Sequence, residues 1–569
     1  MDINSTIAQD RKTFLYRFLE SLLGISTLSF IFGFVVLVIF SPNVAAVFLL
    51  VYAMLWIFKI LLNTQYTILS YKNFLRWEKV DWEKFLDGFD DPEIAKNNFK
   101  LLENKYKNKI NWTNSLISSK NEYLNLLESG SKYANPKNVF NVAIFATYNE
   151  SSDVLKRSLA CLRDCGWDMK NLVITVSQEA RAGDDFNAKL RSEIFDLDWI
   201  AGFYLDEPEN VENIKIDPQK LNVWFTQHPD GLIGEIKGKA SNEDWGARRC
   251  LDILENRLGV DLDLTLVTSL DADSHICKWF FHNLSYKFCF VPDRHQAGFQ
   301  PMHVYSNNLF QTGMIPRMVA SQTTIYNMTN LSIADQAFFF AIYSVPARVL
   351  QKVDFWVKEI IAEDSLLFTK CLTTFNGNFR IYAHYGIFEG DAVEADDYLE
   401  EILNQYKQLQ RWSWGGVEGF PYLFKRLWLT KESKNIKLIT KIKWTYLKFG
   451  NHFFWVTTPF IFSIGPLLPE IIHNRLFTNT VIAQNLNLMT SYFSWISLIS
   501  VGVFAFLTTT FQAKRAVGGE KLGIGNYTTL AIQFICGPIL FGVMAFPALD
   551  AQIRGVMGKY LGYWVTPKK

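Results

Sequence analysis

The stretch that decides the fold is Leu264-Thr265-Leu266-Val267-Thr268-Ser269-Leu270-Asp271-Ala272-Asp273, an apolar run that stops at two carboxylates spaced D-x-D. A run rich in Leu, Val and Thr predicts a buried strand. In open α/β sheets, ligands bind just beyond the carboxyl ends of the strands. Two Asp side chains there suit Mg²⁺ or Mn²⁺ bound together with phosphate oxygens. Taken alone, a D-x-D also fits a solvated turn or a helix cap, so the flanking segments must decide.

The composition indicates a membrane protein with a large soluble part. The 569 residues exceed one ordinary domain, and the chain is 49% hydrophobic and 15% aromatic, yet 20% charged. The net charge of +1 gives no global field for nucleic acid, so we expect no nucleic-acid partner. The seven Cys include no C-x-x-C pair, which favours reduced thiols on a cytosolic face over disulfides or a zinc site.

Two apolar runs, residues 20–40 and 44–62, open the chain. Each is close to the ~20 residues that cross a bilayer. The outer ends of the pair carry Arg11, Lys12 and Arg17 before it and Lys72, Arg76 and Lys79 after it. The positive-inside rule places both ends in the cytoplasm and Pro42 outside. A cleaved signal peptide is the competing interpretation of the first run, disfavoured because a second span follows at once. Residues 1–78 are thus predicted to form two transmembrane helices.

The middle of the chain alternates between strand and helix patterns. Residues 79–138 are charged, with apolar residues at helical spacing, and predict a helical linker. From 139 to 425, strands are expected at 139–146, 172–176 and 200–205, with helices between them and a polar insertion at 206–236. This order predicts a cytosolic α/β domain with a mainly parallel sheet and helices on both faces.

Residues 426–569 are predicted to return to the membrane. A basic, aromatic stretch up to Lys448 suits an interfacial helix, and three apolar runs follow at about 452–472, 488–510 and 528–547. The last run is broken by Gly537-Pro538, so a re-entrant hairpin and a full span both remain open. The side of the membrane on which the C-terminus lies stays open with them.

Further short motifs lie on both sides of the D-x-D. In chain order the set is Thr147-Tyr148-Asn149-Glu150, Gly238-Lys239-Ala240-x-Asn242, Asp271-x-Asp273, Glu363-Asp364 and Gln408-x-x-Arg411-Trp412. This order, with apolar spans at both ends, resembles the membrane-embedded glycosyltransferases of family 2, the group of cellulose, chitin and hyaluronan synthases. The resemblance covers roughly residues 139–425 and the layout of the spans. It implies a GT-A type fold flanked by transmembrane helices at both ends, in a multi-pass protein of the plasma or inner membrane.

The resemblance also implies roles for these residues. The donor would be a nucleotide-sugar, a UDP-sugar by expectation, and the metal Mg²⁺ or Mn²⁺. Asp271 and Asp273 would hold the diphosphate and the metal, and Asp364 would be the general base. The other implied contacts are Thr147, Tyr148 and Glu150 with the nucleotide, Lys239 with the phosphates, and Gln408, Arg411 and Trp412 with the diphosphate and the acceptor sugar. The family usually has an Asp after the second strand; here Glu179 takes that place, so the base is not fixed by the sequence.

Each motif has a structural alternative. Acids such as Glu363 and Asp364 are favourable in the first turn of any helix. Trp412 is also typical of an anchor at the membrane interface. Lys239 beside a glycine is compatible with a solvated lysine.

Three functions follow from these patterns. The first is inverting transfer of a sugar to a growing β-linked polysaccharide. The second is transfer of a single sugar to a membrane lipid. The third, a transporter or receptor without catalysis, is disfavoured because the predicted spans hold almost no charge at their centres.

Overall fold

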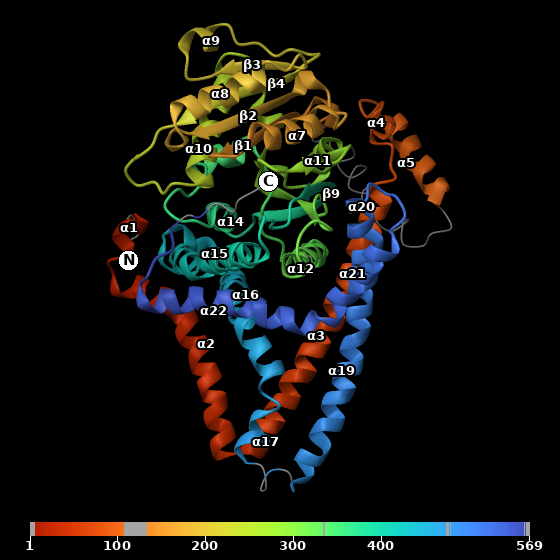
Figure 1. Cartoon of the computed structure of the whole chain (residues 1–569). Coiled ribbons are helices and arrows are strands. Elements are labelled where there is room, and N and C mark those ends of the chain that lie inside the picture. The colour runs from red at the N-terminus through yellow and green to blue at the C-terminus, as the bar shows by residue number, and fades with distance from the viewer. Residues whose placement is uncertain are drawn as a thin grey trace.

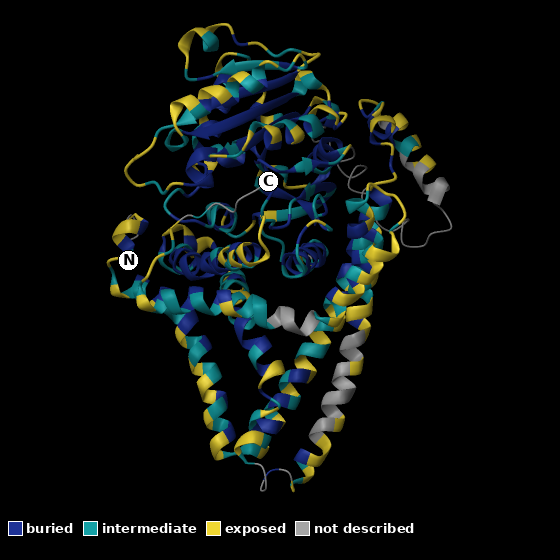
Figure 2. Ribbon diagram, in the orientation of Figure 1, coloured by how far each residue is buried: buried dark blue, intermediate teal, exposed yellow. Residues whose placement is uncertain are grey.

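The computed structural model describes residues 6–106, 134–333, 336–473, 477, 479–562 and 564. An α/β domain forms one end of the molecule, and long helices extend from it at the other end (Figure 1). Buried side chains gather in the domain, whereas exposed ones line much of the long helices (Figure 2).

A nine-stranded sheet organises the domain. Its order is β3 (Ile200–Tyr204), β4 (Leu221–His228), β2 (Leu172–Glu179), β1 (Phe140–Thr147), β5 (Thr265–Asp271), β8 (Tyr343–Pro346), β7 (Ala297–Tyr305), β9 (Arg380–Gly390) and β6 (His275–Ile276). The strands from β3 to β5 are parallel, but β8 runs antiparallel to β5 and β7, and β6 antiparallel to β9. Strand β7 pairs parallel with β9, so the sheet is mixed but most of its pairings are parallel, as expected.

Strand β4 lies inside residues 206–236, where the sequence predicted only a polar insertion. Leu221, Val223, Trp224 and Phe225 are buried, and β4 pairs with both β2 and β3. Hydrophobic burial between two existing strands, rather than the polar flanks, decides the structure of this segment.

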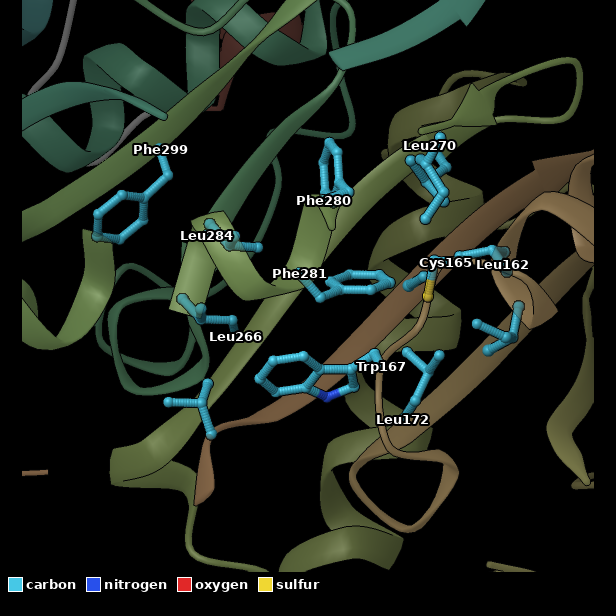
Figure 3. Close-up of a cluster of buried hydrophobic side chains, with 14 of the residues drawn as sticks. Leu162, Cys165, Trp167, Leu172, Leu266, Leu270, Phe280, Phe281, Leu284 and Phe299 are labelled. Carbon is cyan, nitrogen blue, oxygen red and sulfur yellow. The ribbon is translucent and has the colours of Figure 1, made fainter. Parts of the chain in front are cut away.

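Helices cover both faces of the sheet, as expected. Successive side chains of a strand point to opposite faces. Ala143 and Phe145 of β1 pack in one core with the helices α7 (Ser152–Arg163), α8 (Asp184–Phe195) and α11 (Phe280–Phe290). Figure 3 shows part of this core. Val142 and Ile144 face the opposite core, with α10 (Lys239–Asn256), α13 (Ala347–Lys352) and α14 (Glu363–Thr374).

A layer of helices lies between the domain and the long helices (Figure 1). It consists of α12 (Met314–Asn330), α15 (Tyr398–Phe424) and α22 (Gly537–Met557). Glycines permit close crossings in this layer. A Cβ at Gly24 of α2 (Phe14–Phe40) would lie 2.6 Å from the Gln552 carbonyl oxygen, and one at Gly555 would lie 2.5 Å from Val417. Helices α2, α15 and α22 are thus held together at small residues.

Two helices of the described residues, α2 and α3 (Pro42–Trp77), are long and apolar enough to cross a membrane. Large apolar side chains such as Phe32, Phe40 and Phe58 are exposed on them, as a lipid-facing surface requires. Helix α16 (Leu438–Ser463) packs against α2, and α19 (Val481–Leu507) packs against α3. Because α2 and α3 are the two candidate spans among the described residues, spans at the C-terminal end stay a prediction.

The predicted C-terminal segments divide differently in the structure. The basic stretch before Lys448 and the apolar run after it form one helix, α16. The run 528–547 breaks at Cys536 into α21 (Ile524–Ile535) and α22, which packs on α15. The remaining helices are α1 (Ile7–Asp10), α4 (Trp82–Leu86), α5 (Pro92–Tyr106), α9 (Pro208–Glu212), α17 (Leu468–Ile472) and α20 (Ala513–Ala516). The predicted linker continues beyond α5 into residues 107–133, outside the described residues.

Candidate functional site

The predicted site residues begin at one edge of the sheet. Ala146 of β1 pairs with Asp271 of β5, and Thr147 pairs with Gln178 of β2. Because these strands are parallel, their carboxyl ends open on the same side. Thr147, Glu179 and the D-x-D are therefore brought to one edge, as the sequence predicted.

Lys239 lies at the centre of a cluster of charges. It begins α10 after Gly238, whose φ of 150° favours glycine. Its Nζ lies 2.7 Å from Asp271 Oδ1, 3.7 Å from Glu363 Oε1 and 3.8 Å from Glu243 Oε1. Lys239 is only 8% exposed. It is thus a buried cation among carboxylates, which rules out the solvated-lysine alternative.

The pKa values of two of these carboxyls are strongly raised. Burial raises the pKa of Glu243 from 4.5 to about 8, although the nearby Lys239 ammonium opposes the shift. Burial likewise raises the pKa of Glu363 to about 7. Glu243 also accepts a hydrogen bond from the Ser269 hydroxyl. The sequence analysis overlooked Glu243; its signal was its position one helical turn after Lys239.

Asp364 lies next to this cluster at the start of α14. Its Oδ1 accepts a hydrogen bond from the Ser365 N–H at 2.5 Å, and its Oδ2 accepts one from the Ala341 N–H at 3.3 Å. The Ala341 carbonyl accepts a hydrogen bond from Lys239 Nζ at 3.3 Å. Ala341 has a φ of 55°, a strained value for a residue other than glycine. One strained peptide segment therefore joins the expected phosphate-binding lysine to the expected base.

Burial raises the pKa of Asp364 above its ordinary value, while the Ser365 N–H and the Lys448 ammonium of α16 oppose the shift. A carboxylate with a raised pKa is a stronger base than one in water. This environment distinguishes Asp364 from an ordinary acid in a helix first turn, which would be solvated.

The second aspartate of the D-x-D faces a tyrosine and an arginine. Asp273 is 6% exposed. Burial raises the pKa of Tyr305 above its ordinary value; Asp271 and Asp273 raise it further, and Arg411 lowers it. Asp271, Asp273 and Arg411 of α15 therefore all lie within electrostatic reach of Tyr305. The sequence held no signal for Tyr305.

The nucleotide side of the site is formed around an arginine that the sequence analysis overlooked. Arg181 forms an ion pair with Glu179, and its guanidinium lies 3.8 Å from the centre of the Tyr148 ring. Glu150 accepts a hydrogen bond from the Tyr148 N–H at 2.7 Å. Burial raises the pKa of Glu179, an effect that Arg181 opposes. Tyr148, Glu150 and Glu179 thus lie together, as expected.

Helix α15 carries the last motif. Gln408 accepts a hydrogen bond from Gln405 at 2.9 Å. Arg411 and Trp412 are both half-buried. One turn after Trp412, Gly416 lies against the His452 ring of α16, where a Cβ would come within 2.3 Å. Trp412 is therefore placed at the junction of the domain with α16, where an acceptor contact and an interfacial anchor both remain compatible with it.

A divalent cation fits the D-x-D only if the phosphates of a bound donor also coordinate it. Among the described residues, no three His, Cys, Asp or Glu side chains are grouped closely enough to hold a metal. Mg²⁺ usually binds through one or two carboxylates plus phosphate oxygens and water. Asp271 and Asp273 supply such carboxylates, although Asp271 is also paired with Lys239. The donor set fits an ion that arrives with a diphosphate.

A cavity of about 740 Å³ lies beside the site, at the carboxyl ends of β3 and β4. Its lining includes Ala180, Asp206, Gln227, Trp245 and Arg249. None of the predicted site residues lines it. The cavity adjoins the Arg181 side of the site but does not contain the D-x-D.

The mannosyltransferase PcManGT from Pyrobaculum calidifontis, in complex with GDP-Man and Mn²⁺, is 13% identical, with a TM-score of 0.38 over 78% of this chain and 95% of that chain. TarS residues 1–349 from S. aureus are 11% identical, with a TM-score of 0.30 over 74% of this chain and 92% of that chain. Curated proteins give no match. Residues 266–510, which include Asp271, Asp364 and Arg411, match the family model described as glycosyl transferase family group 2.

Proposed function

We propose that the protein is a metal-dependent, inverting glycosyltransferase that transfers a sugar from a nucleotide-sugar donor to an acceptor at the membrane. The observation that carries the proposal is the Lys239–Ala341–Asp364 connection beside Asp271. It brings Lys239, Asp271 and Asp364 around one point, an arrangement that suits a phosphate-binding cation, a metal-binding carboxylate and a base. The family match of residues 266–510 supports the same reaction class.

The donor side must stabilise a leaving diphosphate. When bound at Asp271 and Asp273, Mg²⁺ or Mn²⁺ supplies charge neutralisation as a Lewis acid. Lys239 and Arg411 add fixed positive charge where negative charge develops, which is usually the largest catalytic effect. Thr147, Tyr148, Glu150 and Glu179 would contact the nucleotide.

The acceptor side needs a base. Asp364 takes the proton of the acceptor hydroxyl as the new bond to the anomeric carbon forms and the bond to the diphosphate breaks. Attack opposite the leaving group inverts the anomeric centre. Such a base contributes on the order of 10²–10⁴-fold.

We expect the acceptor to bind at the membrane side of the domain. Gln408, Arg411 and Trp412 lie on α15, which packs against α2, α16 and α22. An acceptor held at this junction would be a growing β-linked polysaccharide, with a lipid that receives a single sugar as the second candidate. In either case we propose a multi-pass protein of the plasma or inner membrane with its catalytic domain in the cytosol.

The test is a donor screen. Purified full-length protein in nanodiscs receives UDP- and GDP-sugars with Mg²⁺ or Mn²⁺, and nucleoside diphosphate release and product size are measured. We expect release that needs metal and falls at least about 10²-fold in Asp364→Asn. A long product supports the synthase, whereas one sugar on a lipid supports the second candidate. Equal rates in wild type and Asp364→Asn would remove Asp364 from the mechanism.

A further inference from the structure

We infer that Lys448, on helix α16 outside the sheet domain, is a positioning residue for this reaction, which places a positive charge near the Asp364 carboxylate and fixes the start of α14. The inference rests on the proposed function, because it assigns a partner to the same base. Lys448 belongs to none of the motifs in the sequence.

A short chain of contacts joins Lys448 to the base. Lys448 Nζ donates a hydrogen bond to Ser365 Oγ at 3.1 Å. Ser365 follows Asp364 directly, and its N–H donates to Asp364 Oδ1 at 2.5 Å. The ammonium group therefore reaches Asp364 through Ser365, which contacts Oδ1, whereas Lys239 is connected through Ala341 to Oδ2. From there it favours the ionised form of Asp364.

Glycines on α15 make room for this arrangement. A Cβ at Gly419 would lie 3.1 Å from Lys448 Nζ, and one at Gly416 would lie 2.3 Å from the His452 ring. Lys448 and His452 are one turn apart on α16, and Gly416 and Gly419 share a face of α15. The two helices approach closely along this line. A larger side chain at Gly419 would push the ammonium group from Ser365.

The other charges around Asp364 are already engaged. Glu363, on α14 itself, and Asp271 and Glu243 all share the Lys239 ammonium of α10. Glu418 of α15 is paired with Arg11 at 2.7 Å.

Burial lowers the pKa of Lys448 to about 8, an effect that the Asp364 carboxylate opposes, so Lys448 is mostly charged at neutral pH. Burial also lowers the pKa of His452, one turn beyond Lys448 on α16, so this ring is neutral and adds no second positive charge near the base. Since Lys239 divides its charge among three carboxylates, Lys448 is the cation that acts on Asp364 through Ser365.

The first test is a pH profile of kcat/KM for full-length protein in nanodiscs. Lys448→Met keeps the length of the side chain and removes its charge, and Lys448→Arg keeps the charge. In Lys448→Met we expect the acidic limb to move up by about one pH unit, with activity recovered at higher pH. Lys448→Arg should keep the wild-type limb. An unmoved limb, or a uniform loss at every pH, would overturn the inference; Lys448→Gln replaces Lys448→Met if the latter does not fold.

A second measurement does not depend on activity. Infrared difference spectra follow protonation of the Asp364 carboxyl, assigned by its loss in Asp364→Asn, in wild type and in Lys448→Met. We expect a higher midpoint in Lys448→Met. A shifted midpoint in a protein that transfers no sugar would reject the proposed function and keep the pairing. An active wild type with an unshifted midpoint in Lys448→Met would reject the pairing alone.

Discussion

At the scale of single residues, the site is dominated by an imbalance of charge. Asp271, whose side chain is 37% exposed, and the more buried Glu243 and Glu363 share the Lys239 ammonium group. Buried carboxylates that exceed their counter-charges are costly, so protons or a cation must compensate. A bound diphosphate would compete with Asp271 for Lys239 and free that carboxylate for the metal. A bound donor–metal complex would therefore balance the excess of carboxylates at this site.

Removal of the cation should destabilise the protein. We expect Lys239→Met to lower the stability by roughly 3–5 kcal/mol, because it removes the positive charge that the buried Glu243 and Glu363 share. The measurement is the thermal unfolding midpoint in detergent. The double variant Lys239→Met/Glu243→Gln, which removes one of the stranded charges, should recover part of the loss. Equal midpoints for Lys239→Met and wild type would contradict the buried cluster.

The same cluster predicts a pH dependence of stability. Burial raises the pKa of Glu243 from 4.5 to about 8. A carboxyl with a higher pKa in the folded state stabilises the fold fully below its unfolded pKa, and this contribution is lost as the pH rises through its folded pKa. Wild type should therefore lose stability between about pH 4.5 and 8, and Glu243→Gln should lose less. Parallel midpoint–pH curves for the two proteins would show that Glu243 ionises normally.

At the scale of elements, α15 depends on α22 for its position. Asp550 of α22 accepts hydrogen bonds from the Tyr406 hydroxyl, at 3.2 Å, and from the Gln410 side-chain amide. These residues flank Gln408 and precede Arg411 and Trp412 on the same helix. Helix α22, which begins within the last apolar run of the sequence, thus holds the part of α15 that carries the Gln408 motif, although α22 contains none of the motif residues.

Loss of this attachment should affect the reaction more than the fold. In Asp550→Ala we expect kcat/KM to fall on the order of 10- to 100-fold, because small displacements of catalytic groups are costly. The control is Arg554→Ala, which removes only the partly exposed Arg554–Asp550 pair at 3.0 Å and should change activity little. Similar kinetics for Asp550→Ala and wild type would show that α22 does not position α15.

At the scale of the whole molecule, the site lies between the sheet and the long helices. Arg411 of α15 lies within electrostatic reach of Tyr305 at the end of β7, and α15 packs against α2, α16 and α22. An acceptor that entered from the membrane would thus meet the donor at this boundary. The two candidate spans α2 and α3 turn at Ser41, at the end farthest from the domain (Figure 1).

This arrangement predicts the topology. A membrane-impermeant maleimide should label Asn43→Cys, an exposed site at the turn, in intact cells that express the protein. Lys189→Cys on α8, whose side chain is 76% exposed, should be labelled only after lysis. Wild type gives the background from the seven native cysteines. Labelling of Lys189→Cys in intact cells would place the domain outside.

Local patterns in the chain were sufficient for much of this structure. The apolar run before Asp271 and the acids that begin α14 appear where expected, because period and capping depend on neighbouring residues. The helix expected to close with the Gln408 motif is present but continues to Phe424. The glycosyltransferase resemblance likewise agrees with the family match of residues 266–510. The roles assigned to the individual site residues stay predictions.

Contacts between distant segments decided the rest. Strand β4 gains its place from β2 and β3, and Lys448 reaches Asp364 only because Gly416 and Gly419 admit α16. Arg181 and Glu243 become significant through burial against partners that the tertiary structure supplies. Burial and electrostatics depend on what surrounds a side chain, and those surroundings come from parts of the chain far apart in sequence.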